Sequence, residues 1–188
     1  MKKKLLAMVL TLALLPVISL SAGALEPQDF AGGSLSGLAA DKNALLVTDT
    51  FNKIIWRVEN GAVTRWAGKP GVADLHGEPS GAYVDAKLDE ARFMEPWAIA
   101  PYLDGYAVTD TAANVVRYVD GKTVRTAAGS GVKGQTNGSG ATVSFARPTG
   151  LAAGADGELY IADTDNGLIR RLDKQGKVTT WASGLEEP

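Results

Sequence analysis

The stretch GELYIADTDNGLIRRLDKQGKVTTWAS, residues 157–183, contains the pattern that decides the fold. Two short apolar runs, Leu159–Ala162 and Leu168–Leu172, lie on either side of a polar break, and a turn at Gly176 leads to a third run, Val178–Trp181. Short runs rich in branched and aromatic residues, separated by Asn-Gly or Gly turns, are typical of strands joined in hairpins. Three such strands cannot bury both of their faces, so we expect this unit to pack against copies of itself.

Two further copies of the pattern precede this stretch. Asp49 lies 19 positions before Gly68 (68 − 49 = 19), and Asp110 lies 19 positions before Gly129 (129 − 110 = 19). From Asp163 the corresponding residue is Ser183, 20 positions on, because a turn in the third copy has one extra residue. A spacing that agrees this closely over three copies indicates a repeat protein.

Each copy is preceded by a short apolar segment rich in small residues, so every repeat supplies four strands. The predicted strands are residues 37–40, 45–49, 54–58 and 63–67, then 97–100, 106–110, 115–119 and 124–128, then 149–153, 158–162, 168–172 and 178–182. The copies are joined by Gly-rich connections that end in Phe-x-x-Pro, at Phe93–Pro96 and Phe145–Pro148. These apolar anchors indicate ordered surface loops, which are common places for binding. Any helix is expected only at about 83–92.

The N-terminus has the pattern of an export signal. Lys2, Lys3 and Lys4 precede an apolar stretch from Leu5 to Leu20, and Ala22-Gly23-Ala24 has the form of a signal peptidase site. A membrane anchor is the alternative, but the 16 apolar-biased residues are fewer than the roughly 20 that a span requires. We therefore predict a signal peptide at residues 1–24, cleaved after Ala24, and a secreted or cell-surface protein with no membrane span after cleavage.

Charge and cysteine content exclude several classes of function. Removal of three lysines changes the formal charge from −2 to −5, and no basic patch is evident, so a nucleic-acid partner is not expected. The chain has no cysteine, which rules out disulfides and thiolate chemistry.

The third copy resembles the NHL repeat of bacterial secreted and teneurin-type proteins. The resemblance rests on Phe145–Pro148, on the Asp-Gly-x-Leu-Tyr-Ile-Ala-Asp-Thr-x-Asn run at 156–166, on Ile169-Arg170-Arg171, and on Gly-x-Val-x-Thr from Gly176. It covers residues 36–184 and implies an all-β fold: a partial β-propeller with three four-stranded blades of a ring that commonly has six. The expected organisation is a lead-in segment at 25–35 and a propeller portion at 36–188, with blades at about 36–68, 96–129 and 148–184.

Two departures from the NHL pattern concern the earlier copies. Trp56 stands where the return strand is expected to carry Arg, and Ala113 stands where Asn is expected, with Asn114 one position later, which predicts a hairpin of different shape. The repeated motif residues are interpreted as structural, since a carboxylate at a strand end can accept hydrogen bonds from the amides of the following turn. They are Asp49, Thr50, Asn52, Asp110, Thr111, Asp163, Thr164 and Asn166.

No residue is predicted to be catalytic, to bind a cofactor or to bind a metal. His76 is the only histidine and lies in a loop, and the segment Gly129–Gly134 lacks the Gly-Lys-Ser/Thr ending of a phosphate loop. Trp66 and Trp181 occupy the same position in two copies, where packing over a blade edge is favoured over binding, and Trp97 is expected in the core. The candidate binding surface consists of Trp66, Trp181, His76 and Asn137.

Two functions fit these observations. The first is a binding or scaffolding module for a protein or carbohydrate ligand, incomplete in itself, whose ring is closed by further blades of the same protein or by a homodimer. The second is a secreted propeller hydrolase or lyase of the gluconolactonase-like type with a divalent metal. The inner segments Gly37–Ala40, Trp97–Ala100 and Gly150–Ala153 contain no charged residue, which favours binding over metal-dependent catalysis.

Overall fold

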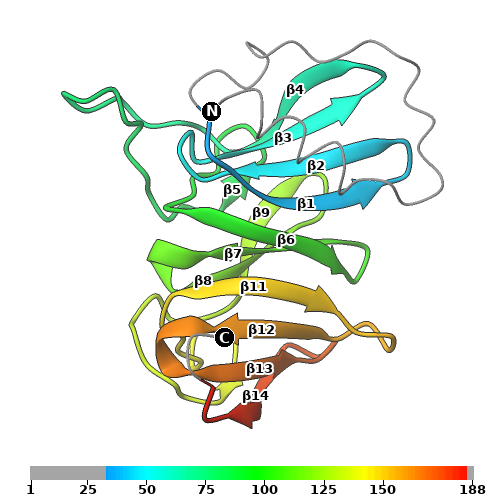
Figure 1. Cartoon of the computed structure of the whole chain (residues 1–188), viewed down its shortest axis with the longest axis vertical. Coiled ribbons are helices and arrows are strands. Elements are labelled where there is room, and N and C mark those ends of the chain that lie inside the picture. Colours follow the sequence, from blue (N-terminus) through cyan, green and yellow to red (C-terminus); the bar gives the residue numbers. More distant parts are fainter. Residues whose placement is uncertain (1–32, 186–188) are drawn as a thin grey trace.

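The computed structural model describes residues 33–185, which form three antiparallel sheets arranged one after another along an arc (Figure 1). The predicted signal peptide and most of the lead-in segment lie outside the described residues. Within residues 33–185 no helix has the length and apolar character needed to cross a membrane.

Each sheet is one blade, and its four main strands are hydrogen-bonded in chain order. Blade 1 comprises β1 (Leu35–Asp41), β2 (Ala44–Asp49), β3 (Ile54–Glu59) and β4 (Ala62–Ala67). Blade 2 comprises β6 (Pro96–Tyr102), β7 (Gly105–Asp110), β8 (Val115–Val119) and β9 (Thr123–Ala128). Blade 3 comprises β11 (Pro148–Ala153), β12 (Leu159–Asp163), β13 (Leu168–Leu172) and β14 (Lys177–Ser183). All twelve predicted strands are confirmed, and the fold is all-β.

The two connections between blades contain strands that the sequence did not reveal. β5 (Ala86–Lys87) pairs with β9, and β10 (Gly138–Ser139) pairs with β14, so each connection adds a short fifth strand to the outer edge of the blade that follows it. The helix expected at 83–92 is wrong. After β5 the backbone makes a single turn, in which the Ala91 N–H donates to the Lys87 carbonyl, because the segment is already committed to pairing with blade 2.

The hairpins after the motif Asp residues share one shape. Thr111–Ala113 and Thr164–Asn166 each form a 3-10 turn, and the next residue, Asn114 (φ 54°) or Gly167 (φ 62°), is left-handed. The expectation of a differently shaped hairpin in the second copy is therefore wrong. Asn tolerates the left-handed conformation better than most residues, so Asn114 replaces Gly167 without a change of backbone.

Alternate side chains of each blade pack against the blade before and the blade after. We call these two surfaces of a blade its leading face and its trailing face. The trailing face of blade 1 (Leu46, Ile55, Ala67) packs on the leading face of blade 2 (Ile99, Val108, Val119, Val124) in one buried cluster. The trailing face of blade 2 (Ala107, Val116, Ala128) packs in the same way on the leading face of blade 3 (Ile161, Leu172, Val178). The core therefore consists of two separate inter-blade layers.

The innermost strands approach each other closely at their backbones. A Cβ atom at Gly37 would lie 2.6 Å from the carbonyl oxygen of Trp97, so the contact between β1 and β6 requires glycine there. Threonine hydroxyls join the same strands across the blade boundaries: Thr48 Oγ1 donates to the Trp97 carbonyl (2.6 Å) and Thr109 Oγ1 donates to the Thr149 carbonyl (2.9 Å). The corresponding residue of blade 3 is Ala162, which has no hydroxyl.

Candidate functional site

The motif Asp residues are fully buried and accept several hydrogen bonds each. Asp163 accepts from the Ala146 amide (2.7 Å), the Asn166 side chain (2.8 Å) and Arg170 (2.9 Å). Asp110 accepts from the amides of Met94 and Glu95. These amides belong to the connection that leads into the blade, whereas the expected donors were those of the following turn. Only Asp49 accepts from a turn amide, that of Asn52 (3.0 Å).

A buried arginine completes this cluster in blades 2 and 3. Arg117 donates to Asp110 (3.0 Å) and Arg170 donates to Asp163 (2.9 Å), and neither guanidinium is exposed. The other nitrogen of Arg170 donates to the Thr136 carbonyl (3.0 Å) and to Asn137 Oδ1 (2.8 Å), and that of Arg117 donates to the Val84 carbonyl (3.0 Å) and to Asp85. Each arginine thus fixes the preceding connection onto its blade.

Blade 1 uses a neutral donor at the same position. The Trp56 indole N–H donates to Asp49 Oδ2 (2.9 Å), while the Ser34 amide and the Asn52 side chain supply further hydrogen bonds to that carboxylate. The departure from the family pattern therefore changes the donor and keeps the contact.

These clusters hold the scaffold and leave little scope for acid–base chemistry. Burial raises the pKa of Asp110, while the amides of Glu95 and Met94 and the Arg117 guanidinium act in the opposite direction. The hydrogen bonds aim every carboxylate at the protein itself, so none faces a space where a substrate could lie. Among residues 33–185 no group of three or more His, Asp or Glu side chains converges as a metal site would require.

The four residues of the candidate binding surface do not form one site. Trp66 packs edge-on against Tyr106 of the next blade, with ring centroids 5.8 Å apart, and the His76 side chain is 89% exposed at the tip of the first connection. Asn137 accepts the Arg170 hydrogen bond described above, and Trp181 is 62% exposed on blade 3, edge-on to Tyr160 at 5.1 Å. The expectation that Trp97 is a core residue is wrong, because its position on the innermost strand leaves it 37% exposed.

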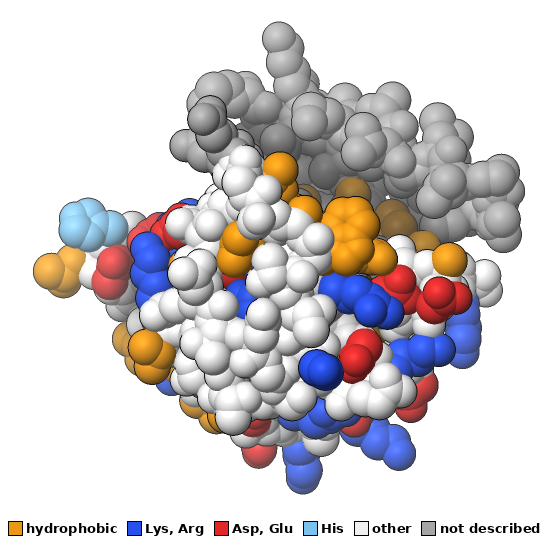
Figure 2. Space-filling view, turned by 90° about the horizontal axis from the view of Figure 1, so that it is seen from below, with side chains coloured by type: hydrophobic (Ala, Val, Ile, Leu, Met, Phe, Trp, Pro, Cys, Tyr) orange, Lys and Arg blue, Asp and Glu red, His pale blue; other side chains and the backbone are white. Residues whose placement is uncertain are grey.

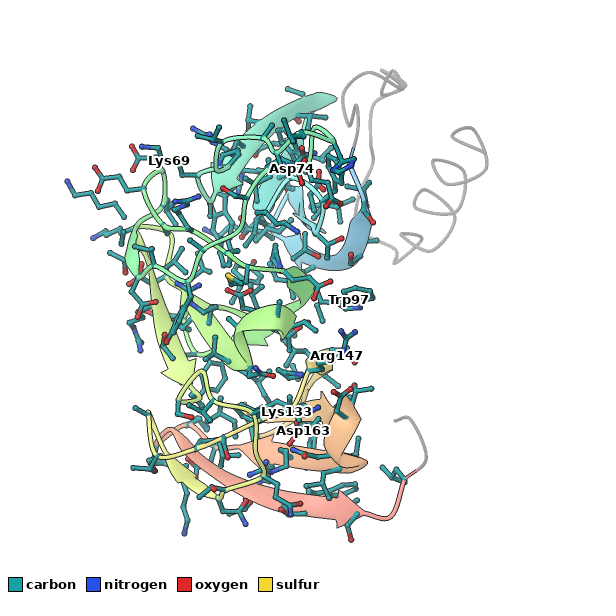
Figure 3. All side chains as sticks on the ribbon, turned by 90° about the vertical axis from the view of Figure 1, so that its left-hand side faces the viewer. Lys69, Asp74, Trp97, Lys133, Arg147 and Asp163 are labelled. Atoms are coloured by element: carbon teal, nitrogen blue, oxygen red, sulfur yellow. The ribbon has the colours of Figure 1, made fainter. Side chains whose placement is uncertain are left out.

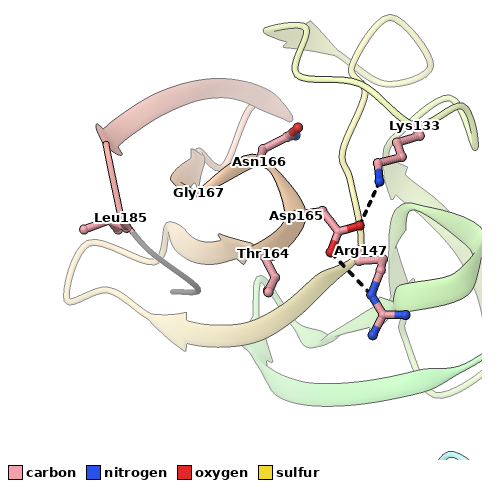
Figure 4. Close-up of a pocket in the computed structure, with 7 residues that line it drawn as sticks. All are labelled: Lys133, Arg147, Thr164, Asp165, Asn166, Gly167 and Leu185. Carbon is pink, nitrogen blue, oxygen red and sulfur yellow. Dashed lines mark hydrogen bonds and ion pairs between the residues drawn. The ribbon is translucent and has the colours of Figure 1, made fainter.

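The side of the arc that carries the motif turns has a hollow at the junction of blades 2 and 3. It encloses about 650 Å³, and its lining residues are Lys133, Arg147, Thr164, Asp165, Asn166, Gly167 and Leu185 (Figure 4). Asp165 lies between two cations, with Oδ2 2.8 Å from Lys133 Nζ and Oδ1 3.5 Å from Arg147 Nε. The hollow therefore contains two positive groups and one negative group. We call this set the rim triad: Lys133, Asp165 and Arg147.

The backbone of Arg147 is held in an unusual conformation. Its φ is 50°, a left-handed value that is uncommon for a residue other than glycine. The Arg147 N–H donates to Asn114 Oδ1 of blade 2 (2.9 Å), which fixes the residue across the blade boundary. Its side chain remains 54% exposed. Strained residues of this kind are concentrated at functional sites.

Trp97 and Arg147 both project to the concave side of the arc. Figure 3 shows them on the side of the innermost strands, with Lys133 deeper in the same region and Lys69 far away near the outer edge. An indole and a guanidinium, one from β6 and one from the segment before β11, thus share the inner side of the arc. This arrangement can contact a ligand that combines an acidic group with an apolar or ring surface.

A second, smaller hollow of about 370 Å³ lies between blades 1 and 2, next to the β1–β2 and β8–β9 turns. Its arginine, Arg57, is paired with both Asp41 and Glu59, which raise its pKa. Two carboxylates therefore satisfy one cation, so this hollow offers less to an acidic ligand than the rim triad does.

Sequence reasoning missed the rim triad for identifiable reasons. Lys133 was considered only within a Gly-rich segment tested for phosphate binding, and Arg147 stands directly before Pro148, where an extended conformation is the usual expectation. Asp165 is the variable residue of the Asp-Thr-x-Asn motif. A charged residue at that variable position was the one available signal.

Comparison with known proteins agrees with the fold. The NHL repeat model matches residues 145–172. No curated protein matches the sequence at a significant level. A protein of unknown function from Bacteroides thetaiotaomicron has a similar structure, with a TM-score of 0.62 and 22% identity over 85% of this chain and 38% of the other.

Two other solved structures are also similar. An auxiliary nutrient binding protein from Bacteroides ovatus gives a TM-score of 0.56 at 16% identity, over 79% of this chain and 36% of the other. A streptogramin B lyase gives 0.52 at 10% identity, over 82% and 42%. The chain thus spans about two fifths of the length of these structures, and it corresponds to part of a larger propeller.

Proposed function

Since the chain carries an NHL repeat and folds as three blades of a β-propeller, we propose that it is a binding module that acts outside the cytoplasm. Its ligand is a protein or carbohydrate that presents a carboxylate to the rim triad. The observation that carries this proposal is the hollow in which Lys133 and Arg147 share the single carboxylate of Asp165.

Charge supports this choice of ligand. A ligand carboxylate would restore one negative group for each cation, and arginine favours carboxylates because its planar guanidinium can donate two parallel hydrogen bonds. Trp97, exposed on the same concave side, would add a flat apolar contact, and tryptophan and arginine are the residues that most often dominate binding energy. The similarity to a nutrient binding protein agrees with binding but concerns the fold alone.

Calorimetric titration with three probes tests the proposal: an oligogalacturonate, a neutral oligosaccharide of the same length, and a Glu-rich peptide. We expect binding of at least one acidic probe and none of the neutral sugar. Arg147→Gln should weaken that binding about 10- to 100-fold, because a hydrogen bond to a charged group contributes about 1.5–3 kcal/mol. The matched control is Lys69→Gln, an exposed cation away from the hollow, which should leave the affinity unchanged.

Equal affinity for acidic and neutral sugars, or no effect of Arg147→Gln, would contradict the proposal. Export is tested separately. Expression with the natural N-terminus should yield an exported product whose first residue is Leu25, as read by mass spectrometry. An uncleaved product retained in the cytoplasm would contradict that part.

A further inference from the structure

The trailing face of blade 3 has no blade packed on it among the described residues, and it differs from the other two trailing faces in burial. Three positions form this face in every blade: Leu46, Ile55 and Ala67 in blade 1, and Ala107, Val116 and Ala128 in blade 2. All six are at most 1% exposed, because the next blade covers them. The blade 3 counterparts, Tyr160, Ile169 and Ala182, are all partly exposed.

Trp181 extends this surface. Ile169 pairs with Ala182 and Arg170 pairs with Thr180, so Trp181 is the extra residue of a β-bulge in β14. Trp66 is the corresponding extra residue of β4, and its ring packs on Tyr106 of the following blade. In blade 1 the bulged tryptophan is thus an inter-blade contact, whereas Trp181 is 62% exposed. Figure 2, which views the molecule from the blade 3 side, shows hydrophobic side chains gathered in the upper part of the view beside charged groups.

We propose that this trailing face binds the leading face of blade 1 in a second copy of the chain, so that two three-blade arcs close into one ring. The surface required is one that blades 2 and 3 already display, with branched apolar residues at fixed positions. Blade 2 uses Val108, Val119 and Val124, and blade 3 uses Ile161, Leu172 and Val178. Blade 1 has Val47, Val58 and Val63 at the same positions, so each copy carries the complementary surface.

Reciprocal docking produces a closed assembly. The trailing face of each copy meets the leading face of the other, and both junctions are equivalent by two-fold symmetry. The resulting six blades lie within the range of 4–8 at which propellers close. At each new junction Trp181 would meet Leu45, which occupies in blade 1 the position of Tyr106 in blade 2.

The mass of the chain in solution, measured by light scattering from about 1 to 100 μM, tests the proposal. We expect a dimer. Trp181→Lys should weaken it at least 100-fold, because a central aromatic contact is lost at both junctions. Trp97→Lys changes an exposed tryptophan on the concave side and should leave the dimer intact. Since Trp97 and Arg147 belong to the proposed ligand site, loss of ligand binding in those variants is independent of the mass measurement.

Ala162→Thr gives a test in the opposite direction. Thr48 and Thr109 accept an amide hydrogen bond within their blade and donate to the inner strand of the next blade. A threonine at position 162 would supply the missing donor at both new junctions, about fivefold for each, so the dissociation constant should fall about 25-fold. A monomer at 100 μM, polymers larger than a dimer, or a dimer unaffected by Trp181→Lys would overturn the proposal, and a monomer would assign the face to a blade from another chain.

Discussion

Blades 1 and 3 show how the same repeat position can use different chemistry. In blade 3 the buried Asp163 pairs with the charged Arg170, whereas in blade 1 the buried Asp49 takes its corresponding hydrogen bond from the neutral indole of Trp56. The carboxylate and the strand geometry are constant, and the donor varies. An arginine has five N–H groups and an indole has one. Arg170 therefore also binds the preceding connection, through Thr136 and Asn137, which a single donor already used on Asp49 could not do.

The same two blades differ at the inner strand. Thr48 joins blade 1 to blade 2 through its hydroxyl, and Ala162 of blade 3 has none. The inter-blade hydroxyl is thus present at both described junctions and missing on the blade whose trailing face is open. A repeat can therefore keep its fold while each blade is adjusted to its neighbour.

Arg170→Gln should have the largest effect on stability. It removes the charge that compensates Asp163, a carboxylate with no exposure to water, and breaking a buried pair in this way costs about 3–5 kcal/mol. Urea unfolding measures the loss. The matched control is Arg171→Gln, the exposed neighbour on the same strand, with an expected change within about 0.5 kcal/mol. Losses of similar size for both variants would show that the buried pair is not what distinguishes blade 3.

Thr109→Val should be next. The change preserves shape but leaves the Ala98 N–H and the Thr149 carbonyl without their partner in a fully buried place, at a cost of about 2 kcal/mol. The same unfolding measurement applies, with the exposed Thr64→Val as control. If Thr109→Val were neutral, the hydroxyl bridge would not explain how adjacent blades are joined.

Trp56→Phe should cost less than either. Asp49 loses one of its donors but keeps the amides of Ser34 and Asn52 and the Asn52 side chain, so we expect a loss of about 1 kcal/mol. The exposed Trp97→Phe serves as control. A loss as large as that of Arg170→Gln would abolish the comparison, because it would mean that a neutral donor and a charged donor contribute equally at this position.

The sequence predicted the fold well because the repeat is encoded locally. Alternating apolar residues, Gly turns and the fixed spacing from Asp to Gly specify all twelve main strands without reference to long-range contacts. The predictions failed where tertiary pairing decides. β5 and β10 are two residues long and exist only because β9 and β14 offer free edges, and the segment at 83–92 pairs with blade 2 in place of forming a helix.

The candidate site was less predictable for the same reason. Lys133, Arg147 and Asp165 lie on three different segments, and their proximity depends on the buried arginine of blade 3 and on Asn114 of blade 2. No local pattern encodes such an arrangement. Trp97 was assigned to the core because it adjoins Pro96 in an apolar run, and only the curvature of the arc exposes it.

The smallest expected effect contrasts the covered and uncovered tyrosines of the trailing and leading faces. Burial raises the pKa of Tyr106, at the covered junction of blades 1 and 2, to about 12, while its hydroxyl donates to the Ala40 carbonyl. Because this folded pKa lies above the ordinary value of 10, the stabilisation is fully present below pH 10 and is lost as the pH rises toward 12. Tyr106→Phe should therefore reduce the decline in the urea midpoint over that range, although Tyr118, whose pKa is also raised to about 12, will preserve part of it. Tyr83→Phe, at a half-exposed ring, is the control. Should the decline be the same in Tyr106→Phe as in the unaltered chain, the Tyr106 hydroxyl would have no part in holding blade 2 against blade 1.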